Sequence, residues 1–293
     1  MKLTILGVAV LSLIPQRALI EPPDISAVIV STEWLANNIS DSSVVVLEIV
    51  HQAPARDRLP GARYLDYMAI TTDRGGNTTE LPEIASLRTA FEAVGVSDSS
   101  HVVLYGDDVV MVARAFFSLD YLGHTNNSVL NGGMAKWKIE NRPVTADVPR
   151  VSPGRITSSE RPELLADAAW VMAHRRKPGV ALIDTRTDGE YLGAGNRSGM
   201  PSDGHIAGAR QLRWQQLTLD PDEGLFREPE SLATLYADRV SPGDTVVTYC
   251  FVGFRASMSY MISRALGYTT KLYDGSYEDW ARRKLPLVRG AKP

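Results

Sequence analysis

The feature that most constrains the fold is a similarity between the two halves of the chain. The apolar run 102–105 matches the run 246–249, and both runs end in tyrosine. In each half a glycine follows 18 residues after this tyrosine, so that Gly123 corresponds to Gly267 without a gap. Self-similarity of this kind is the signature of a repeated architecture. We therefore predict that the two halves are copies of one fold.

Shorter matches flank this pair on both sides. Downstream, each half has an Asn-Gly or Asp-Gly pair that is followed by a tryptophan and then a proline. Upstream, each half has a Gly-Ala-Arg sequence that follows an apolar residue. The matched positions are Asn131, Gly132, Trp137 and Pro143 with Asp274, Gly275, Trp280 and Pro286, and residues 61–63 with 208–210. The duplication therefore extends well beyond a single element.

The order of elements in the first half indicates the type of fold. A continuous apolar run at 44–49 predicts a buried strand, and residues 83–94 have helical spacing up to Gly95. A loop rich in Thr, Gly and Asn is expected at 71–79, and a second strand and helix follow at 101–105 and up to Gly123. Strands that alternate with helices favour an α/β fold, a parallel sheet covered on both faces.

A change of composition separates the halves. Residues 141–162 are rich in Pro, Ser, Thr and Gly and carry no periodic apolar pattern, which is typical of a linker. We predict a first domain over residues 25–145, a linker over 146–162 and a second domain over 163–290.

Composition limits the partners. The chain has 293 residues, 44% of them hydrophobic, a formal charge of −3 and no basic run, so nothing indicates nucleic-acid binding. Small molecules or other proteins are the expected partners, and the oligomeric state is not predicted. Cys250 is the only cysteine, which excludes an internal disulfide.

The first residues favour export. Lys2 precedes an apolar run at 3–14, and Ala18 could precede a cleavage site, so residues 1–18 are interpreted as a signal peptide and the periplasm as the expected location. The alternative is a cytoplasmic protein in which this run is a structural strand. The run is too short for a permanent membrane anchor.

The second half contains one position suited to nucleophilic chemistry. Cys250 follows the apolar run 245–249, and helical spacing begins after Arg255. A turn between strand and helix directs backbone N–H groups and the positive end of the helix dipole at the sulfur, which favours a thiolate, and Arg255 adds a full positive charge. The alternative is a buried structural cysteine without chemistry.

The first half has no equivalent of this position. Gly106 stands opposite Cys250 and Met111 opposite Arg255, while Asp107 and Asp108 bring negative charge to the turn. An anionic sulfur species would be repelled there, so only the second half is expected to carry a site.

The spacing of four residues between Cys250 and Arg255, on the turn after a buried strand, resembles the active-site loop of the rhodanese family of sulfurtransferases. Protein tyrosine phosphatases have five residues in this interval, and here that arginine position holds Ala256. The sequences at 183–186, with Glu190 and Tyr191, and at 204–209 also resemble this family.

A cysteine-free first half and a second half with the cysteine resemble the two-domain thiosulfate and mercaptopyruvate sulfurtransferases over residues 25–290. The resemblance implies two packed domains, each a five-stranded, mostly parallel sheet with helices on both faces. The cleft between the domains would lead to the cysteine loop.

The resemblance also implies roles for residues. Cys250 would carry sulfur as a persulfide, held by the loop that contains Phe251, Val252, Gly253 and Phe254 and closes at Arg255. Arg186 would bind the donor anion; the alternative is an ion pair with Asp184, Asp188 or Glu190. Asp184 is expected to order the loop and His205 to be structural. No metal or cofactor is expected, because no ligand spacing or phosphate fingerprint is present.

The expected function is therefore transfer of sulfur from thiosulfate to cyanide or a thiol. Two alternatives remain: a 3-mercaptopyruvate sulfurtransferase and a non-catalytic rhodanese-like binding module. Phe251, Val252 and Phe254 are apolar and offer no hydroxyl to a ketone, whereas Arg255 and Arg186 could face a compact dianion. This arrangement favours thiosulfate as the donor.

Overall fold

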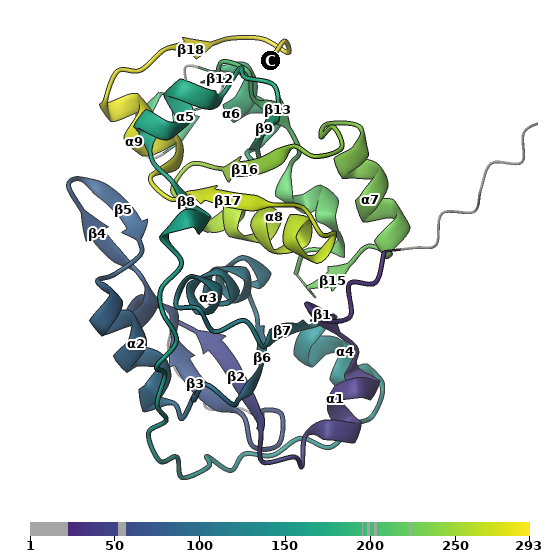
Figure 1. Ribbon diagram of the computed structural model, residues 1–293. Coiled ribbons are helices and arrows are strands. Elements are labelled where there is room, and N and C mark those ends of the chain that lie inside the picture. Colours follow the sequence, from purple (N-terminus) through teal and green to yellow (C-terminus); the bar gives the residue numbers. More distant parts are fainter. Residues whose placement is uncertain (1–22, 52–56, 195, 198–199, 202–203, 223) are drawn as a thin grey trace, which may run out of the picture.

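The computed structural model describes residues 23–51, 57–194, 196–197, 200–201, 204–222 and 224–293. The predicted signal peptide, residues 1–18, lies outside the described residues. The chain forms two domains, the first in purple to teal in the lower part of Figure 1 and the second in teal to yellow above it. Each domain is built around one five-stranded sheet.

The strands of both sheets run parallel to their neighbours. The first sheet has the order β1 (Ile29–Val30), β7 (Asn127–Leu130), β6 (His101–Gly106), β2 (Val44–Val50) and β3 (Arg63–Asp66). The second has the order β8 (Leu165–Ala166), β17 (Thr270–Tyr273), β16 (Thr245–Tyr249), β9 (Val180–Asp184) and β13 (Arg210–Gln211). If the strands of each sheet are numbered along the chain, both sheets have the order first, fifth, fourth, second and third. This shared topology confirms the predicted duplication.

Helices follow the strands in both domains. The first domain contains α1 (Thr32–Asn38), η1 (Tyr67–Ile70), α2 (Ile84–Ala93), α3 (Val109–Tyr121) and α4 (Gly133–Ile139). The second contains η2 (Pro162–Leu164), α5 (Ala168–His174), α6 (Asp188–Leu192), η3 (Trp214–Leu217), α7 (Pro229–Ala237), α8 (Phe254–Ala265) and α9 (Ser276–Arg282). Among the described residues, four short strand pairs complete the fold: β4 (Thr72–Arg74) with β5 (Asn77–Glu80), β10 (Asn196–Arg197) with β11 (Met200–Pro201), β12 (His205–Ile206) with β18 (Leu287–Val288), and β14 (Thr218–Asp220) with β15 (Leu225–Phe226).

Alternation along the strands explains why both faces of each sheet are covered. Val45 and Leu47 of β2 pack with residues of α2 and α3, whereas Val46 between them packs with residues of α1 and α4. In β16, Val246 faces α8 and Val247 faces α5 and α9. Successive side chains of a strand point to opposite faces, so an entirely apolar strand needs helices on both sides.

The duplication extends to individual hydrogen bonds. The hydroxyl of Tyr105 accepts a bond from the Leu59 N–H, and the hydroxyl of Tyr249 accepts one from the Ile206 N–H. The indole N–H groups of Trp137 and Trp280 donate to the carbonyls of Pro143 and Pro286. The tyrosines, tryptophans and prolines are those matched between the two halves of the sequence, and Leu59 and Ile206 each lie two residues before the matched Gly-Ala-Arg sequence.

The predicted loop 71–79 differs from the expectation, and the predicted linker packs against the first domain. The predicted loop 71–79 contains an antiparallel hairpin, in which β4 pairs with β5. In the segment between the domains, Ile156 is buried and its N–H donates to Glu92 of the first domain. The backbone of this segment therefore hydrogen-bonds to the surface of the first domain, because buried polar groups require partners.

The two domains pack through α3 and α8, which lie against each other at the centre of Figure 1. Phe117 of α3 meets Tyr260 of α8 edge to face, with ring centroids 4.8 Å apart. No helix among the described residues is long and apolar enough to cross a membrane.

Candidate active site

Cys250 follows β16, the strand at the centre of the second sheet. The carboxyl ends of such strands are where open parallel sheets bind ligands. The side chain has no exposed surface, and its sulfur accepts a hydrogen bond from the Gly253 N–H at 3.1 Å. The Cys250 N–H donates to the Ser276 hydroxyl at 3.2 Å. The sulfur is thus held by the loop and the loop by the start of α9.

Gly253 is required at the turn between loop and helix. It is the N-cap residue of α8 and has φ +93°, a conformation that L side chains rarely adopt. A Cβ there would lie 2.8 Å from the carbonyl oxygen of Asp274. Glycine therefore allows the chain to approach Asp274 and to direct its own N–H at the sulfur.

Arg255 is held beside the cysteine by a carboxylate. Its two terminal nitrogens donate to the two oxygens of Glu190, each at 2.8 Å. Burial opposes the charge of Arg255, but the bonds with Glu190 and the proximity of Cys250 outweigh it and raise the pKa of the guanidinium. Burial likewise opposes the charge of Glu190, yet the bonds from Arg255 and Thr187 lower its pKa to about 2. The pair is fully ionised at neutral pH.

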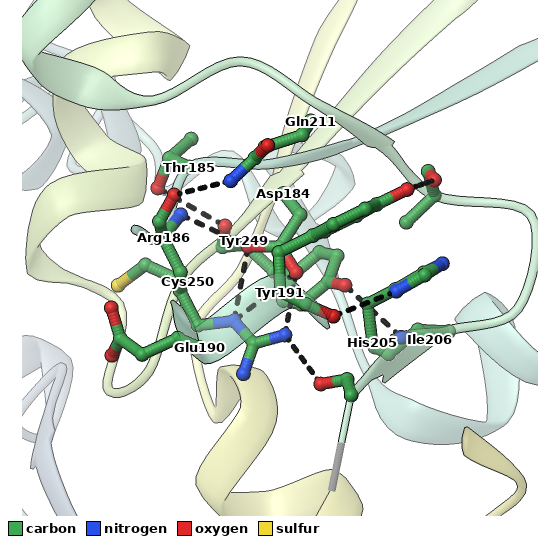
Figure 2. A network of polar contacts seen from close by, with 12 residues as sticks. Asp184, Thr185, Arg186, Glu190, Tyr191, His205, Ile206, Gln211, Tyr249 and Cys250 are labelled. Carbon is green, nitrogen blue, oxygen red and sulfur yellow. Dashed lines mark hydrogen bonds and ion pairs between the residues drawn. The ribbon is translucent and has the colours of Figure 1, made fainter. Parts of the chain in front are cut away.

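Arg186 is buried on the neighbouring strand end. Its Nη2 donates to Asp184 at 2.6 Å and to the Gly204 carbonyl at 2.8 Å, and its guanidinium lies 4.2 Å from the ring centroid of Tyr277. Burial opposes its charge, but Asp184 raises the pKa of the guanidinium. Figure 2 shows this contact with Asp184. The ion pair that the sequence offered as an alternative is therefore present, and the role of Arg186 toward a donor anion stays a prediction.

Comparison with known proteins places this geometry in a family. A family model, the Rhodanese-like domain, matches residues 31–140 and 167–283. The chain belongs to the rhodanese family. Both domains of this rhodanese match the family model, including the one without a cysteine.

Relatives of this rhodanese span nearly the whole chain. The sulfur carrier protein TtuD of Thermus thermophilus is 34% identical over 90% of this chain and 97% of its own length. The thiosulfate sulfurtransferase of Rattus norvegicus is 28% identical over 89% of this chain and 94% of its own. Family and relatives together support a sulfurtransferase. SseA from Escherichia coli, described as a 3-mercaptopyruvate sulfotransferase, has the same fold, with a TM-score of 0.73 at 22% identity over 85% of this chain and 98% of its own.

The remaining residues of the rhodanese loop point in different directions. Phe251 is buried against Tyr277, with ring centroids 5.6 Å apart. The Val252 carbonyl accepts a bond from Thr79 at 2.9 Å. Phe254 meets Tyr67 of the first domain edge to face, with centroids 5.6 Å apart. The loop is therefore lined on one side by the first domain.

Two other predicted residues of this rhodanese have supporting positions. Asp184 accepts bonds from both the backbone N–H and the side chain of Arg186, so it orders the end of β9. His205 is buried and stacked on Tyr191, with ring centroids 3.7 Å apart, and its ring nitrogens contact the carbonyls of Tyr191 and Lys292. Both ring nitrogens contact backbone carbonyl groups, as expected of a structural histidine.

Several contacts of the site were not predicted from the sequence. They involve Glu190 as the partner of Arg255, Ser276 under the cysteine, and Thr79 and Arg114 from the first domain. Only Glu190 belonged to a recognised motif. Within the described part of the chain, no group of three His, Cys, Asp or Glu residues could hold a metal ion.

Proposed function

We propose that this protein transfers the outer sulfur of thiosulfate to cyanide or a thiol through a persulfide on Cys250. The observation that carries the proposal is the only cysteine of the chain, placed at the carboxyl end of the central strand with the Gly253 N–H 3.1 Å from its sulfur. The thiosulfate sulfurtransferases among the relatives support the choice of donor.

The first step is an attack of the Cys250 thiolate on the outer sulfur of thiosulfate. A bond forms between the two sulfurs, the sulfur–sulfur bond of thiosulfate breaks, and its electron pair leaves with sulfite. In the second step a cyanide or thiolate acceptor attacks the outer sulfur of the persulfide. The bond between the outer sulfur and the Cys250 sulfur breaks, and its electron pair returns to Cys250. The cycle therefore restores the thiolate and needs no further reactant.

The residues around the sulfur have distinct tasks in this cycle. The Gly253 N–H donates to the Cys250 sulfur and stabilises the negative charge that this atom carries in the thiolate, both before attack and when the acceptor removes the outer sulfur. Arg255 places a positive charge beside Cys250, and Glu190 fixes the orientation of its guanidinium. No general base is needed, because the nucleophile reacts as an anion.

Thiosulfate is the donor we favour. Phe251, Val252 and Phe254 contribute no hydroxyl that could polarise the ketone of 3-mercaptopyruvate. The fold shared with SseA supports that donor only as the second candidate. Arg255 and Arg186 are each paired with a carboxylate. The electrostatic attraction of the donor anion therefore comes from arginines held in ion pairs and not from two unpaired guanidinium groups.

The test is the mass of the intact protein after incubation with thiosulfate and removal of small molecules. We expect a gain of one sulfur atom, its loss on addition of cyanide, and no gain in Cys250→Ser. A side-by-side assay with 3-mercaptopyruvate compares kcat/KM for the two donors. A parent protein that gains no sulfur from either donor would overturn the proposal and favour a binding module.

A further inference from the structure

One peptide group connects the first domain to the sulfur of Cys250. The Val252 carbonyl and the Gly253 N–H belong to the same peptide unit, and the structure has no cis peptide bond among the described residues. In a planar trans unit these two groups point in opposite directions. Thr79 Oγ1 donates to the carbonyl at 2.9 Å, and the N–H donates to the sulfur at 3.1 Å. A bond at one end therefore fixes the direction of the other.

The hydrogen bond from Thr79 has a second effect. A carbonyl that accepts a hydrogen bond polarises its amide, and chains of hydrogen bonds strengthen one another in this way. The Gly253 N–H thus becomes a better donor to a negatively charged sulfur. Thr79 therefore affects the sulfur through the Val252–Gly253 peptide unit and makes no direct hydrogen bond to the sulfur.

Thr79 itself is held in an unusual conformation. Its φ is +60°, a genuine outlier for a β-branched residue. Strain of this kind persists only where surrounding contacts determine it, and it gathers at functional sites. The Thr79 N–H donates to Asp73 at 3.1 Å, and its carbonyl accepts a bond from Arg114 at 2.9 Å. Both ends of the residue are therefore fixed by its own domain.

Arg114 extends the connection to the far side of the loop. Its side chain is fully buried in α3, and its Nη1 donates to Asp274 at 2.5 Å. Asp274 also accepts a bond from the Leu81 N–H, just after β5, at 2.8 Å. The position of Thr79 is thus tied to the segment against which Gly253 packs.

We propose that Thr79 of the first domain is a positioning residue for catalysis, which acts on the Cys250 sulfur through the Val252–Gly253 peptide unit. The inference rests on the proposed function, because it assigns a role in stabilising the anionic sulfur of that same site. It gives the domain without a nucleophile a part in the chemistry of the other domain.

The experiment compares the titration of Cys250 in the parent, Thr79→Val and Thr79→Ser. Thiolate absorbance is followed with pH, and Cys250→Ser provides the blank. Valine keeps the branched shape and removes the donor, so we expect its titration to move to higher pH, with about three- to tenfold less thiolate below the midpoint. The rate of persulfide formation should fall by the same factor. Serine keeps the hydroxyl and should titrate like the parent.

Thr78→Val is the matched control. Thr78 lies next to Thr79 on the same strand, and its hydroxyl also crosses to the second domain, where it donates to Glu278 at 3.1 Å. This variant loses a comparable bond between domains without touching the loop, so its midpoint should equal that of the parent. An unchanged midpoint in Thr79→Val, or an equal shift in Thr78→Val, would overturn the inference. Titration needs no sulfur donor, so failure of the proposed function would be recognised separately by the mass measurement.

Discussion

At the scale of single residues, the site depends on which carboxylate each arginine meets. Asp184, Asp188 and Glu190 all lie within four residues of Arg186 in sequence, so spacing alone cannot choose among them. The choice follows from a capping box: Thr187 is the N-cap residue of α6, and its N–H and hydroxyl donate to the Glu190 carboxylate at 3.0 and 2.8 Å. This turn presents Glu190 to Arg255, and Arg186 bonds to Asp184.

The charge of Glu190 should stabilise the fold in a defined pH range. Its pKa is lowered to about 2 from an ordinary value of 4.5, so its contribution is complete above pH 4.5 and is lost as the pH falls toward 2. We expect Glu190→Gln to lower the free energy of unfolding by about 2–3 kcal/mol at pH 7, because Arg255 loses a nearly buried partner. Denaturant unfolding of both proteins across this range would measure it, and the difference should shrink on acidification.

Asp188→Asn provides the control for this prediction. Asp188 lies on the same helix and pairs with Arg213 at 3.0 Å, but both side chains are about half exposed. Its removal should cost less than about 1 kcal/mol at pH 7. A Glu190→Gln protein as stable as the parent, or a difference independent of pH, would contradict the prediction.

The sequence predicted the site residues that lie close together along the chain, but it did not predict those that come from the other domain. Cys250, Gly253 and Arg255 share one turn, so their proximity follows from the strand and helix on either side. Thr79 contacts this loop, and Arg114 contacts Asp274 beside it, only because two distant elements are brought together by domain packing. No periodicity or motif specifies such a contact, which depends on the relative placement of two folded domains.

At the scale of elements, long apolar runs were predicted well. The predicted strands 44–49 and 101–105 correspond to β2 and β6, and the predicted helix 83–94 corresponds to α2. The hairpin of β4 and β5 was missed because it is polar and lacks an alternating apolar face. Its stabilising contacts lie elsewhere, for example in the bonds from Thr78 to Glu278 of the second domain.

The turn after β6 should not accept a second catalytic cysteine. A Cβ at Gly106 would lie 2.5 Å from the carbonyl oxygen of Ile49, which requires the backbone to move. Asp108 caps α3 there, where its carboxylate accepts a bond from the Val110 N–H at 2.8 Å and holds negative charge at the turn. We expect Gly106→Cys in a Cys250→Ser background to gain no sulfur from thiosulfate.

Overpacking should also destabilise this variant, by roughly 1–3 kcal/mol. Gly106→Ala introduces the same Cβ without a thiol, so a similar loss of stability in both variants would assign it to the steric clash. Sulfur gain is measured by intact mass and stability by denaturant unfolding. Turnover of thiosulfate by the doubly substituted protein would show that the turn of the first domain retains the means to stabilise an anionic sulfur.

At the scale of the whole molecule, one cluster of buried apolar residues extends across both domains. Phe116 and Phe117 of α3 belong to the same buried cluster as Tyr260 and Met261 of α8. A fully buried carboxylate, Asp120, lies within this interface. Buried charges are stable only when they are paired and hydrogen-bonded, so its partners determine how tightly the domains are joined.

Those partners come from the second domain and from the interdomain segment. Asp120 accepts bonds from the Tyr260 hydroxyl at 2.6 Å and from Arg161 at 3.0 Å, and it pairs with Arg264 at 2.8 Å. A residue of the first domain thereby binds α8 and the end of the interdomain segment. Because these bonds cross the interface, we expect the parent protein to unfold in a single transition.

Asp120→Asn should weaken this coupling. The amide cannot balance the two guanidiniums, so we expect a loss of roughly 2–4 kcal/mol, below that of a fully buried pair because both arginines are partly exposed. Calorimetry should show a lower transition temperature and a broadened or divided transition. Glu163→Gln removes an exposed partner of the same Arg161, at 3.1 Å, and should change stability by less than about 1 kcal/mol. If both substitutions had equal effects, the buried carboxylate would not be what joins the domains, and apolar packing of α3 on α8 would have to account for their cohesion.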